Sequence, residues 1–319
     1  MRKILSVACS FVLLATLLFP ALAQVEAKNL SATSAATQKR YLIIHADDAG
    51  MSHSVNMATM ACLESGIVSS TSIMVPTPWF SEFADYAKKN PQHDYGVHLT
   101  LNSEWDHYRW GPVAPREKVT SLIDKDGYLW DNVKQVVKHA KADEVAIELR
   151  AQIDRAKQFG IPLSHLDTHM GALLSRPDLV QVYVNLALEY ALPILFLRDI
   201  PPRFIKAYPG LATGTKRIVK TLDENNLPLL DSVLQFYGGE NLVQRKENYY
   251  HALENMEAGV GQLIIHCGFD NEELRAITKS ASRRNDDRLI FTSQETATFL
   301  KDQNIQLLNW KQLRAMQNR

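Results

Sequence analysis

The stretch from Tyr41 to Gly50, YLIIHADDAG, constrains the fold of this chain more than any other. Its first four residues form an apolar run that is typical of a parallel strand covered on both faces. Asp47 and Asp48 follow where such a strand ends, and sites in α/β barrels and open α/β sheets lie at the carboxyl ends of strands. The stretch therefore predicts a strand that carries two carboxylates to a site. The alternative is that the acids cap a helix beginning just after the glycine.

The first 23 residues have the pattern of a secretory signal peptide. Arg2 and Lys3 precede an apolar run of about a dozen residues, and small residues at 21–23 form a cleavage site. The run is short for a bilayer span, so we expect no stable membrane span after processing. The sequence thus predicts export to the periplasm or the extracellular space, with the polar residues 24–40 as a flexible leader.

The composition points away from a nucleic-acid partner. Processing removes Arg2 and Lys3 from 35 basic residues that stand against 35 acidic ones, so the mature chain is nearly neutral. A hydrophobic content of 46% suits a single barrel-sized domain over residues 41–319. Two cysteines remain, Cys62 and Cys267, which either pair in an oxidising compartment or stay as buried thiols. The oligomeric state stays open.

Strand-like and helix-like segments alternate along the chain, which indicates an α/β protein with a mainly parallel sheet. Residues 201–258 show no clear pattern. We expect strands, after the first, at 67–75, 95–101, 163–171, 192–197, 261–270 and 304–310, and helices at 55–65, 81–89, 142–159 and from Pro177 onward.

Residues 102–141 form an aromatic-rich insertion that is too long for an ordinary connection between a strand and a helix. It holds three of the five tryptophans, Trp105, Trp110 and Trp130. Aromatic faces stack on sugar rings, so a loop of this kind over a site suits a carbohydrate. The alternative is a small satellite core under a long loop.

Further polar residues fall at the ends of the other expected strands. His98 interrupts YGVHLTL, and His266 ends the apolar run of GQLIIHCG. In LSHLDTHMG, the residues His165, Asp167 and His169 alternate, and residues two apart share one face of an extended chain. Because parallel strands bring their carboxyl ends to one rim, we expect these side chains to gather around the acid pair.

Such a set of side chains suits a hydrolytic metal site. One aspartate and two histidines give a metal three protein ligands and leave positions open for water and substrate. Imidazole with carboxylate favours zinc, with magnesium as the alternative. A second aspartate can take the proton of the metal-activated water, and a separate histidine can protonate the leaving group.

The motifs ADDAGMSHSVN, GVHLTLN, SHLDTHMG and LIIHCG occur in this order between residues 41 and 270. The chain thereby resembles the YdjC-like carbohydrate deacetylases (the ChbG/HpnK group), which are related to the NodB-type polysaccharide deacetylases. The resemblance implies a distorted (β/α) barrel, similar to a TIM barrel. It also implies metal-dependent removal of an N-acetyl group from an amino sugar or oligosaccharide, with Asp47 as general base and His266 as general acid.

The same resemblance implies one divalent metal ion bound by Asp48, His98 and His169. Residues implied to lie behind these ligands or against the substrate are His165, Asp167, which would orient an imidazole, and Arg198. Trp105 and Trp110 of the aromatic-rich insertion are further candidates for contact with a sugar. Two alternatives remain open. One is hydrolysis of another amide, an ester or a glycosidic bond, and the other is a non-catalytic sugar-binding protein.

Overall fold

The computed structural model describes residues 39–317, which form one compact unit. The predicted signal peptide, and residues 24–38 of the predicted leader, lie outside the described residues. Among the described residues, no helix combines the length and apolar character needed to cross a bilayer.

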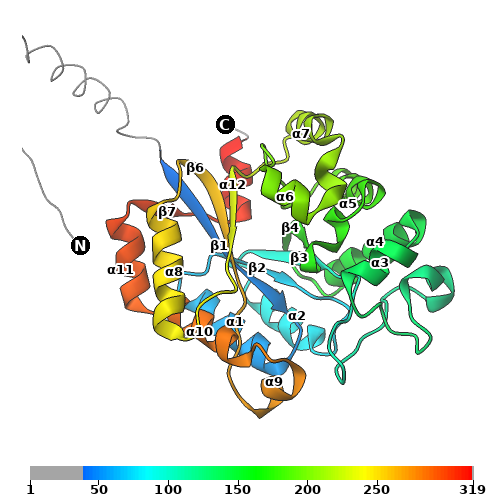
Figure 1. The fold of residues 1–319 in the computed structure, drawn as a ribbon, viewed down its shortest axis with the longest axis horizontal. Coiled ribbons are helices and arrows are strands. Elements are labelled where there is room, and N and C mark those ends of the chain that lie inside the picture. The colour runs from blue at the N-terminus through cyan, green and yellow to red at the C-terminus, as the bar shows by residue number, and fades with distance from the viewer. Residues whose placement is uncertain (1–38, 318–319) are drawn as a thin grey trace, which may run out of the picture. The chain divides into compact units, whose positions relative to one another are not determined.

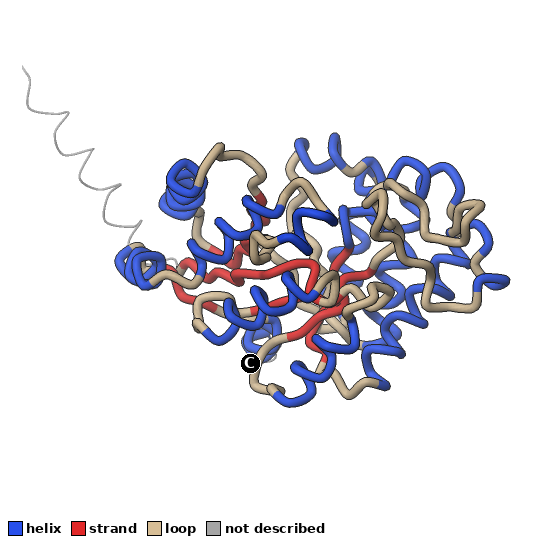
Figure 2. The backbone as a smooth tube through the Cα atoms, turned by 90° about the horizontal axis from the view of Figure 1, so that it is seen from below, coloured by secondary structure: helices blue, strands red, loops and turns tan. Residues whose placement is uncertain are grey.

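A parallel sheet forms the centre of the fold (Figure 1), with helices around the outside (Figure 2). The strand order is β4-β3-β2-β1-β6-β5, and β7 pairs with the start of β1. Every strand pair is parallel, so the carboxyl ends lie at one rim. The strands are β1 (Arg40–Ala49), β2 (Ser70–Ile73), β3 (Tyr95–Leu99), β4 (Leu163–Thr168), β5 (Ser232–Gln235), β6 (Gly259–Ile265) and β7 (Ile305–Leu307).

An irregular segment joins the two edges of this sheet. Leu195 donates its backbone N–H to Leu166 on β4 (3.1 Å), and Arg198 donates to Leu230, just before β5 (2.8 Å). The segment at 192–197, predicted as a strand, therefore forms isolated bridges on both sides and no regular strand. The expected α/β fold, a distorted (β/α) barrel, is confirmed.

The helices cover the sheet and connect its strands (Figure 1). Helix α1 begins where Ser52 accepts a hydrogen bond from the backbone of Val55, and Pro177 opens α5 as predicted. The α-helices are α1 (His53–Glu64), α2 (Phe80–Lys89), α3 (Val133–His139), α4 (Ala142–Gln158), α5 (Pro177–Tyr190), α6 (Pro202–Ala207), α7 (Thr215–Glu224), α8 (Leu242–Glu254), α9 (Glu272–Ile277), α10 (Ala281–Phe291), α11 (Gln294–Asp302) and α12 (Trp310–Gln317). Short 3-10 helices are η1 (Arg116–Lys118), η2 (Thr120–Leu122), η3 (His169–Leu174) and η4 (Pro209–Ala212).

The aromatic-rich insertion at 102–141 packs its side chains against the body of the domain. Trp110 is buried, and its ring packs edge-on against that of Trp105 with centroids 5.5 Å apart. Trp130 stacks on His139 at 4.3 Å. Glu148 of α4 anchors the loop by accepting hydrogen bonds from two of its backbone N–H groups. The buried side chains of the insertion therefore belong to the main hydrophobic core and not to a separate satellite core, and Trp105 lines the cavity described below.

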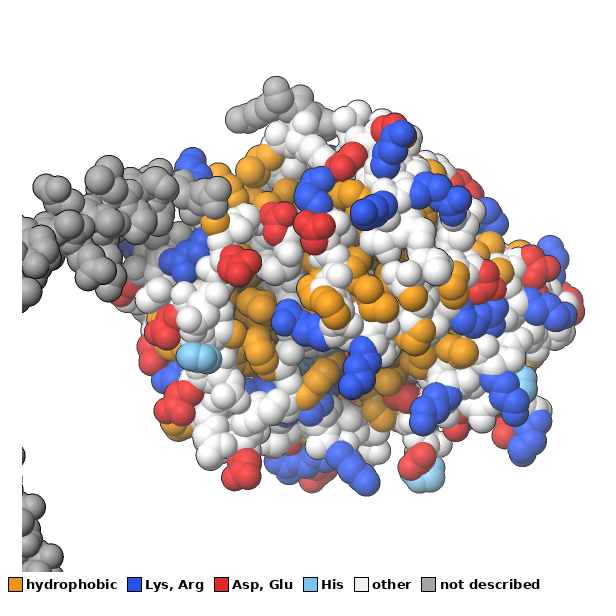
Figure 3. Space-filling model, turned by 45° about the horizontal axis from the view of Figure 1, so that its top comes forward, with side chains coloured by type: hydrophobic (Ala, Val, Ile, Leu, Met, Phe, Trp, Pro, Cys, Tyr) orange, Lys and Arg blue, Asp and Glu red, His pale blue; other side chains and the backbone are white. Residues whose placement is uncertain are grey.

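Cys62 and Cys267 are both free and buried, with their sulfur atoms 3.2 Å apart. Of the two alternatives for this pair, the structure has the buried thiols. On the face shown in Figure 3, basic and acidic side chains are interspersed, in keeping with a formal net charge of zero for the whole chain.

Candidate metal and active site

The end of β1 places two adjacent carboxylates in one cavity. Its pairing register with β2 shifts between Ala46 and Ala49, and Asp48 has a positive φ of 70°. This irregularity lets Asp47 and Asp48 both line the cavity, whereas a regular strand would point them to opposite sides. Because Ser52 caps α1, the structure does not support the alternative role of the acids as helix caps.

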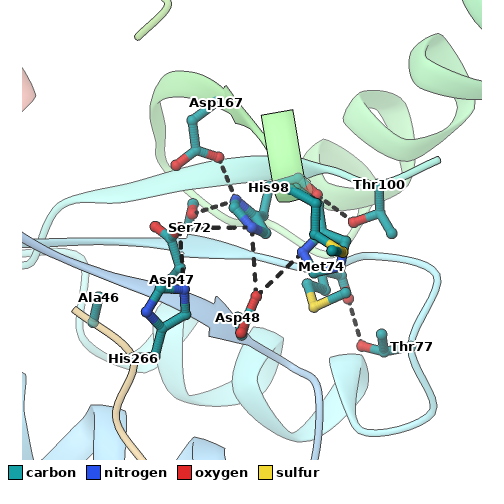
Figure 4. Close-up of polar contacts among 12 residues, drawn as sticks. Ala46, Asp47, Asp48, Ser72, Met74, Thr77, His98, Thr100, Asp167 and His266 are labelled. Carbon is teal, nitrogen blue, oxygen red and sulfur yellow. Dashed lines mark hydrogen bonds and ion pairs between the residues drawn. The ribbon is translucent and has the colours of Figure 1, made fainter. Parts of the chain in front are cut away.

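Three ligand atoms converge beside β1, and Figure 4 labels two of the residues that supply them, Asp48 and His98. The Oδ1 atom of Asp48 lies 3.4 Å from Nε2 of His98 and 3.4 Å from Nδ1 of His169. All three side chains are buried, and Asp48 Oδ1 has no hydrogen-bond partner among the described residues. A buried carboxylate oxygen without a partner is costly, so this group fits a cation. The predicted ligand set is therefore brought together.

In each of the two imidazoles, the nitrogen that points away from Asp48 lies against another carboxylate. Nδ1 of His98 lies 2.7 Å from Asp167, which is the orienting contact expected of that aspartate. Nε2 of His169 lies 3.1 Å from each carboxylate oxygen of Glu104. These contacts leave the other nitrogen of each ring facing Asp48.

Arg284 of α10 fixes the third ligand. Its guanidinium donates to Oδ2 of Asp48 at 2.6 Å, so the other carboxylate oxygen is left toward the two imidazoles. This pair keeps the pKa of Asp48 well below its usual range, in spite of the burial that opposes ionisation. The ligand is thus a carboxylate at neutral pH.

Two other groupings of the same kind exist among the described residues. One contains His45, His165 and Asp167, and the other contains Asp47, His98 and Asp167. Both use Asp167, whose two oxygens already lie 3.0 Å from His45 and 2.7 Å from His98. We therefore consider the group around Asp48 the better cation site.

Asp47 lies beside the proposed ligands. Its Oδ1 is 3.3 Å from Nε2 of His45, and its Oδ2 is 3.8 Å from Nε2 of both His98 and His266. Burial raises the pKa of Asp47 to about 7, and the neighbouring Asp167 adds to this effect, while His98 opposes it. A carboxyl with this pKa exchanges a proton near neutral pH, as a general base requires.

His266 follows β6 and faces Asp47 (Figure 4). Its backbone N–H donates to Asp287 at 3.0 Å, and its ring lies 5.7 Å from that of Tyr237. Burial lowers the pKa of His266 to about 3, so the imidazole is neutral at pH 7. The side chain is well placed for proton transfer, but it must first receive the proton that it donates.

A cavity of about 620 Å³ opens above these side chains, within the usual size range of small-ligand sites. Aromatic and apolar side chains line one part of it, and cationic groups of the segment before α10 and of α10 itself line another. Its lining includes Asp47, Asp48, His98, Glu104, Trp105, Asp167, His169, Met170, Phe204, Tyr208, Tyr237, His266, Lys279, Arg283 and Arg284.

Three residues expected at the site do not line this cavity. His165 lies deeper in the barrel, where its ring stacks on Trp310 at 5.2 Å, because it precedes Asp167 by two residues along β4. Trp110 is buried in the insertion. The side chain of Arg198 forms an exposed ion pair with Asp223 (3.0 Å) instead of reaching the cavity.

Several site residues were missed in the sequence. His45 lies within the first motif, and its position two before Asp47 is a signal that places both side chains on one face of an extended strand. Glu104 stands in the irregular insertion, and Arg284 in the charged run ASRRNDDR, so neither had a local pattern to mark it. Tyr237 lies in the region without a clear pattern.

The fold and the cavity at the carboxyl ends of the strands place this chain among the α/β-barrel proteins with a rim site. The chain belongs to the YdjC-like protein family, whose model matches residues 41–302. This confirms the family resemblance found in the motifs.

Similar proteins extend over most of the chain. A carbohydrate deacetylase of Thermoanaerobacter pseudethanolicus is 28% identical over 275 residues, covering 86% of this chain and 100% of the relative. A carbohydrate deacetylase of Thermus thermophilus is 33% identical, covering 78% and 85%. Among solved structures, an Enterococcus faecalis protein described as involved in cellobiose-phosphate cleavage is 26% identical, with a TM-score of 0.71 and coverage of 86% and 99%.

Proposed function

We propose that this chain is an exported, metal-dependent hydrolase that removes an N-acetyl group from an amino sugar or oligosaccharide. The observation that carries the proposal is the convergence of Asp48, His98 and His169 beside a second buried carboxylate, Asp47. The names of the relatives, carbohydrate deacetylases, support the substrate class.

The donor set of one carboxylate and two imidazoles suits zinc better than magnesium, which prefers oxygen ligands. A zinc ion bound there would lower the pKa of its water and polarise the acetyl carbonyl. Asp47 would accept the proton of this water at its carboxylate, which lies beside the proposed ligands. The leaving amine would take up the proton that Asp47 accepts from the water, and the imidazole of His266, whose Nε2 lies 3.8 Å from Oδ2 of Asp47, is placed to assist this transfer.

The walls of the cavity support a sugar as the substrate. Trp105, Tyr208 and Tyr237 all line it, and aromatic rings pack well on the apolar faces of pyranose rings. Tyr237 is 53% exposed, so its ring is available to a ligand. The volume of about 620 Å³ is large enough for a small ligand of this class.

The test is acetate release from N-acetylglucosamine and its oligomers after loading with zinc or magnesium. We expect release by the wild type and loss of at least about 100-fold in Asp47→Asn and His98→Ala, since both the base and a ligand are needed. Asp85→Asn, on the surface of α2, is the matched control and should keep full activity. A wild type that binds metal but releases no acetate from any of these sugars would overturn the proposal.

Export is proposed on the first 23 residues alone. The expected product of processing begins at Gln24, and the amino-terminal sequence of the exported protein tests this. A protein that keeps Met1 and stays inside the cell would contradict it.

A further inference from the structure

We propose that Glu104 is a positioning residue that fixes His169 for metal binding, so that the aromatic-rich insertion braces the metal site. The inference rests on the metal site of the proposed function. It concerns a residue that comes from outside the strand-end motifs and gives the start of the insertion a defined role.

The contact between Glu104 and His169 determines which imidazole nitrogen is free. Nε2 of His169 lies 3.1 Å from Oε1 and 3.1 Å from Oε2 of Glu104. A nitrogen that faces a carboxylate at this distance carries the hydrogen, and a neutral imidazole has only one. In the neutral ring that binds a metal, Nδ1 therefore has the lone pair, and this atom lies 3.4 Å from the unpartnered Oδ1 of Asp48.

His169 depends on this contact more than the other imidazole ligand depends on any single partner. His98 has two partners at its Nδ1, Asp167 at 2.7 Å and Ser72 at 3.1 Å. Within the described part of the chain, Glu104 alone has hydrogen-bond geometry to the ring of His169. His169 also lies just past the end of β4, and the next residue, Met170, has a positive φ of 51°, so strand pairing does not hold the backbone of His169.

Glu104 is itself held in place. Asn102 donates from Nδ2 to its Oε2 at 3.0 Å, and Asn102 is fully buried. The next residue, Ser103, donates its backbone N–H to Trp130 at 2.8 Å, which ties this end of the loop to the far end of the insertion. The carboxylate is therefore presented by a fixed backbone, as an orienting group must be.

A competing role for Glu104 is direct: its charge could act on the metal or the substrate, because the side chain also lines the cavity. The variant Glu104→Gln separates the two roles. Its Oε1 can still accept from Nε2 of His169. Its new NH₂ group can donate to Oδ1 of Asn102 once the side-chain amide of Asn102 rotates by half a turn. That buried oxygen has no hydrogen-bond partner in the wild type.

The experiment measures zinc affinity by competition with a chelator and the visible spectrum of the Co²⁺-loaded protein. The variants are Glu104→Ala, Glu104→Gln and, as a matched control in the same loop, the exposed Asp106→Ala. We expect Glu104→Ala to weaken zinc binding by about 10- to 100-fold and to alter the Co²⁺ spectrum. Glu104→Gln and Asp106→Ala should stay well within 10-fold of the wild type.

Two results would overturn the inference: wild-type affinity and spectrum in Glu104→Ala, or a loss in Glu104→Gln as large as in Glu104→Ala. Thermal unfolding of the metal-free variants shows whether a loss comes from misfolding, and Glu104→Gln keeps the test valid if the alanine variant does not fold. Failure here is distinct from failure of the proposed function. A wild type that binds zinc and releases acetate while Glu104→Ala binds zinc normally rejects the positioning role only, whereas a wild type without zinc affinity rejects both.

Discussion

Removal of the Asp287 carboxylate should destabilise the protein more than any conservative surface change. Asp287 lies on α10 and is 1% exposed. Its Oδ1 accepts from Arg245 (2.7 Å) and from the hydroxyl of Tyr249 (2.8 Å), and its Oδ2 accepts the backbone N–H of His266 (3.0 Å). Asp287→Ala therefore breaks a buried ion pair and frees a backbone N–H beside the site.

The expected cost follows from these contacts. Removing one partner of a buried ion pair costs about 3–5 kcal/mol, because the remaining charge is left without compensation. An unsatisfied buried N–H adds about 1–3 kcal/mol, although the two costs overlap. Replacing both charges with apolar groups, as in Arg245→Met with Asp287→Leu, removes the buried charge altogether. This double variant should cost less than Asp287→Ala alone.

Urea unfolding followed by circular dichroism measures these free energies. The matched control is Asp286→Ala, the neighbouring position on α10, for which we expect a change within about 0.5 kcal/mol. Arg245 also donates to the backbone carbonyls of Phe236 and Gly238, on either side of Tyr237, so acetate release should fall as well. A cost for Asp287→Ala equal to that of Asp286→Ala would refute this account. So would a double variant that loses the sum of the two single changes.

Three further predictions concern pH, metal and packing. Burial raises the pKa of Glu148 from 4.5 to about 7, so its contribution to stability is full below pH 4.5 and is lost as pH rises through 7. The free energy of unfolding of Glu148→Gln, measured in urea relative to that of the wild type, should therefore rise by up to about 3 kcal/mol between pH 5 and pH 8. A difference between the two proteins that stays constant with pH would contradict this. Zinc at about 100 times its Kd should stabilise the folded wild type by about 2.7 kcal/mol and so raise its Tm by a few degrees. The Tm of His98→Ala should not change. Equal shifts in the two proteins would count against the ligand assignment. A Cβ on Gly96 would lie 2.3 Å from Nε2 of His165, so Gly96→Ala should lower the free energy of unfolding by about 1–3 kcal/mol. Adding His165→Ala should relieve part of that loss. Strictly additive losses in the double variant would show that the clash is absent.

Much of the fold could be predicted because the parallel strands carry continuous apolar runs. The first strand and those predicted at 95–101, 163–171 and 261–270 are present, mostly shorter by a few residues. Strand β5 (Ser232–Gln235) was missed, because its sequence SVLQ has a polar residue at each end and its pairing with β6 depends on distant residues. The segment at 192–197 was predicted as regular because its apolar run does not reveal that it crosses between two sheet edges.

Much of the site could also be predicted, for a related reason. Asp48, His98 and His169 each lie at or just after the carboxyl end of a strand, and parallel strands bring such ends together without further information. Alternation along a strand gives the face of a side chain but not its depth, so His165 was expected too close to the cavity. Arg198 was also misplaced, because its partner Asp223 lies on a helix from the region without a pattern.

Helix α10 supplies what the strand-end motifs lack. Arg284 and Asp287 are three residues apart and so lie on one side of the helix. The first binds the carboxylate of Asp48 at the end of β1, and the second binds the backbone of His266 at the end of the adjacent β6. One helix thus holds a proposed metal ligand and the proposed acid at a fixed distance from each other. The relation between ligand and acid is therefore a property of tertiary packing, which no motif along a single strand can encode.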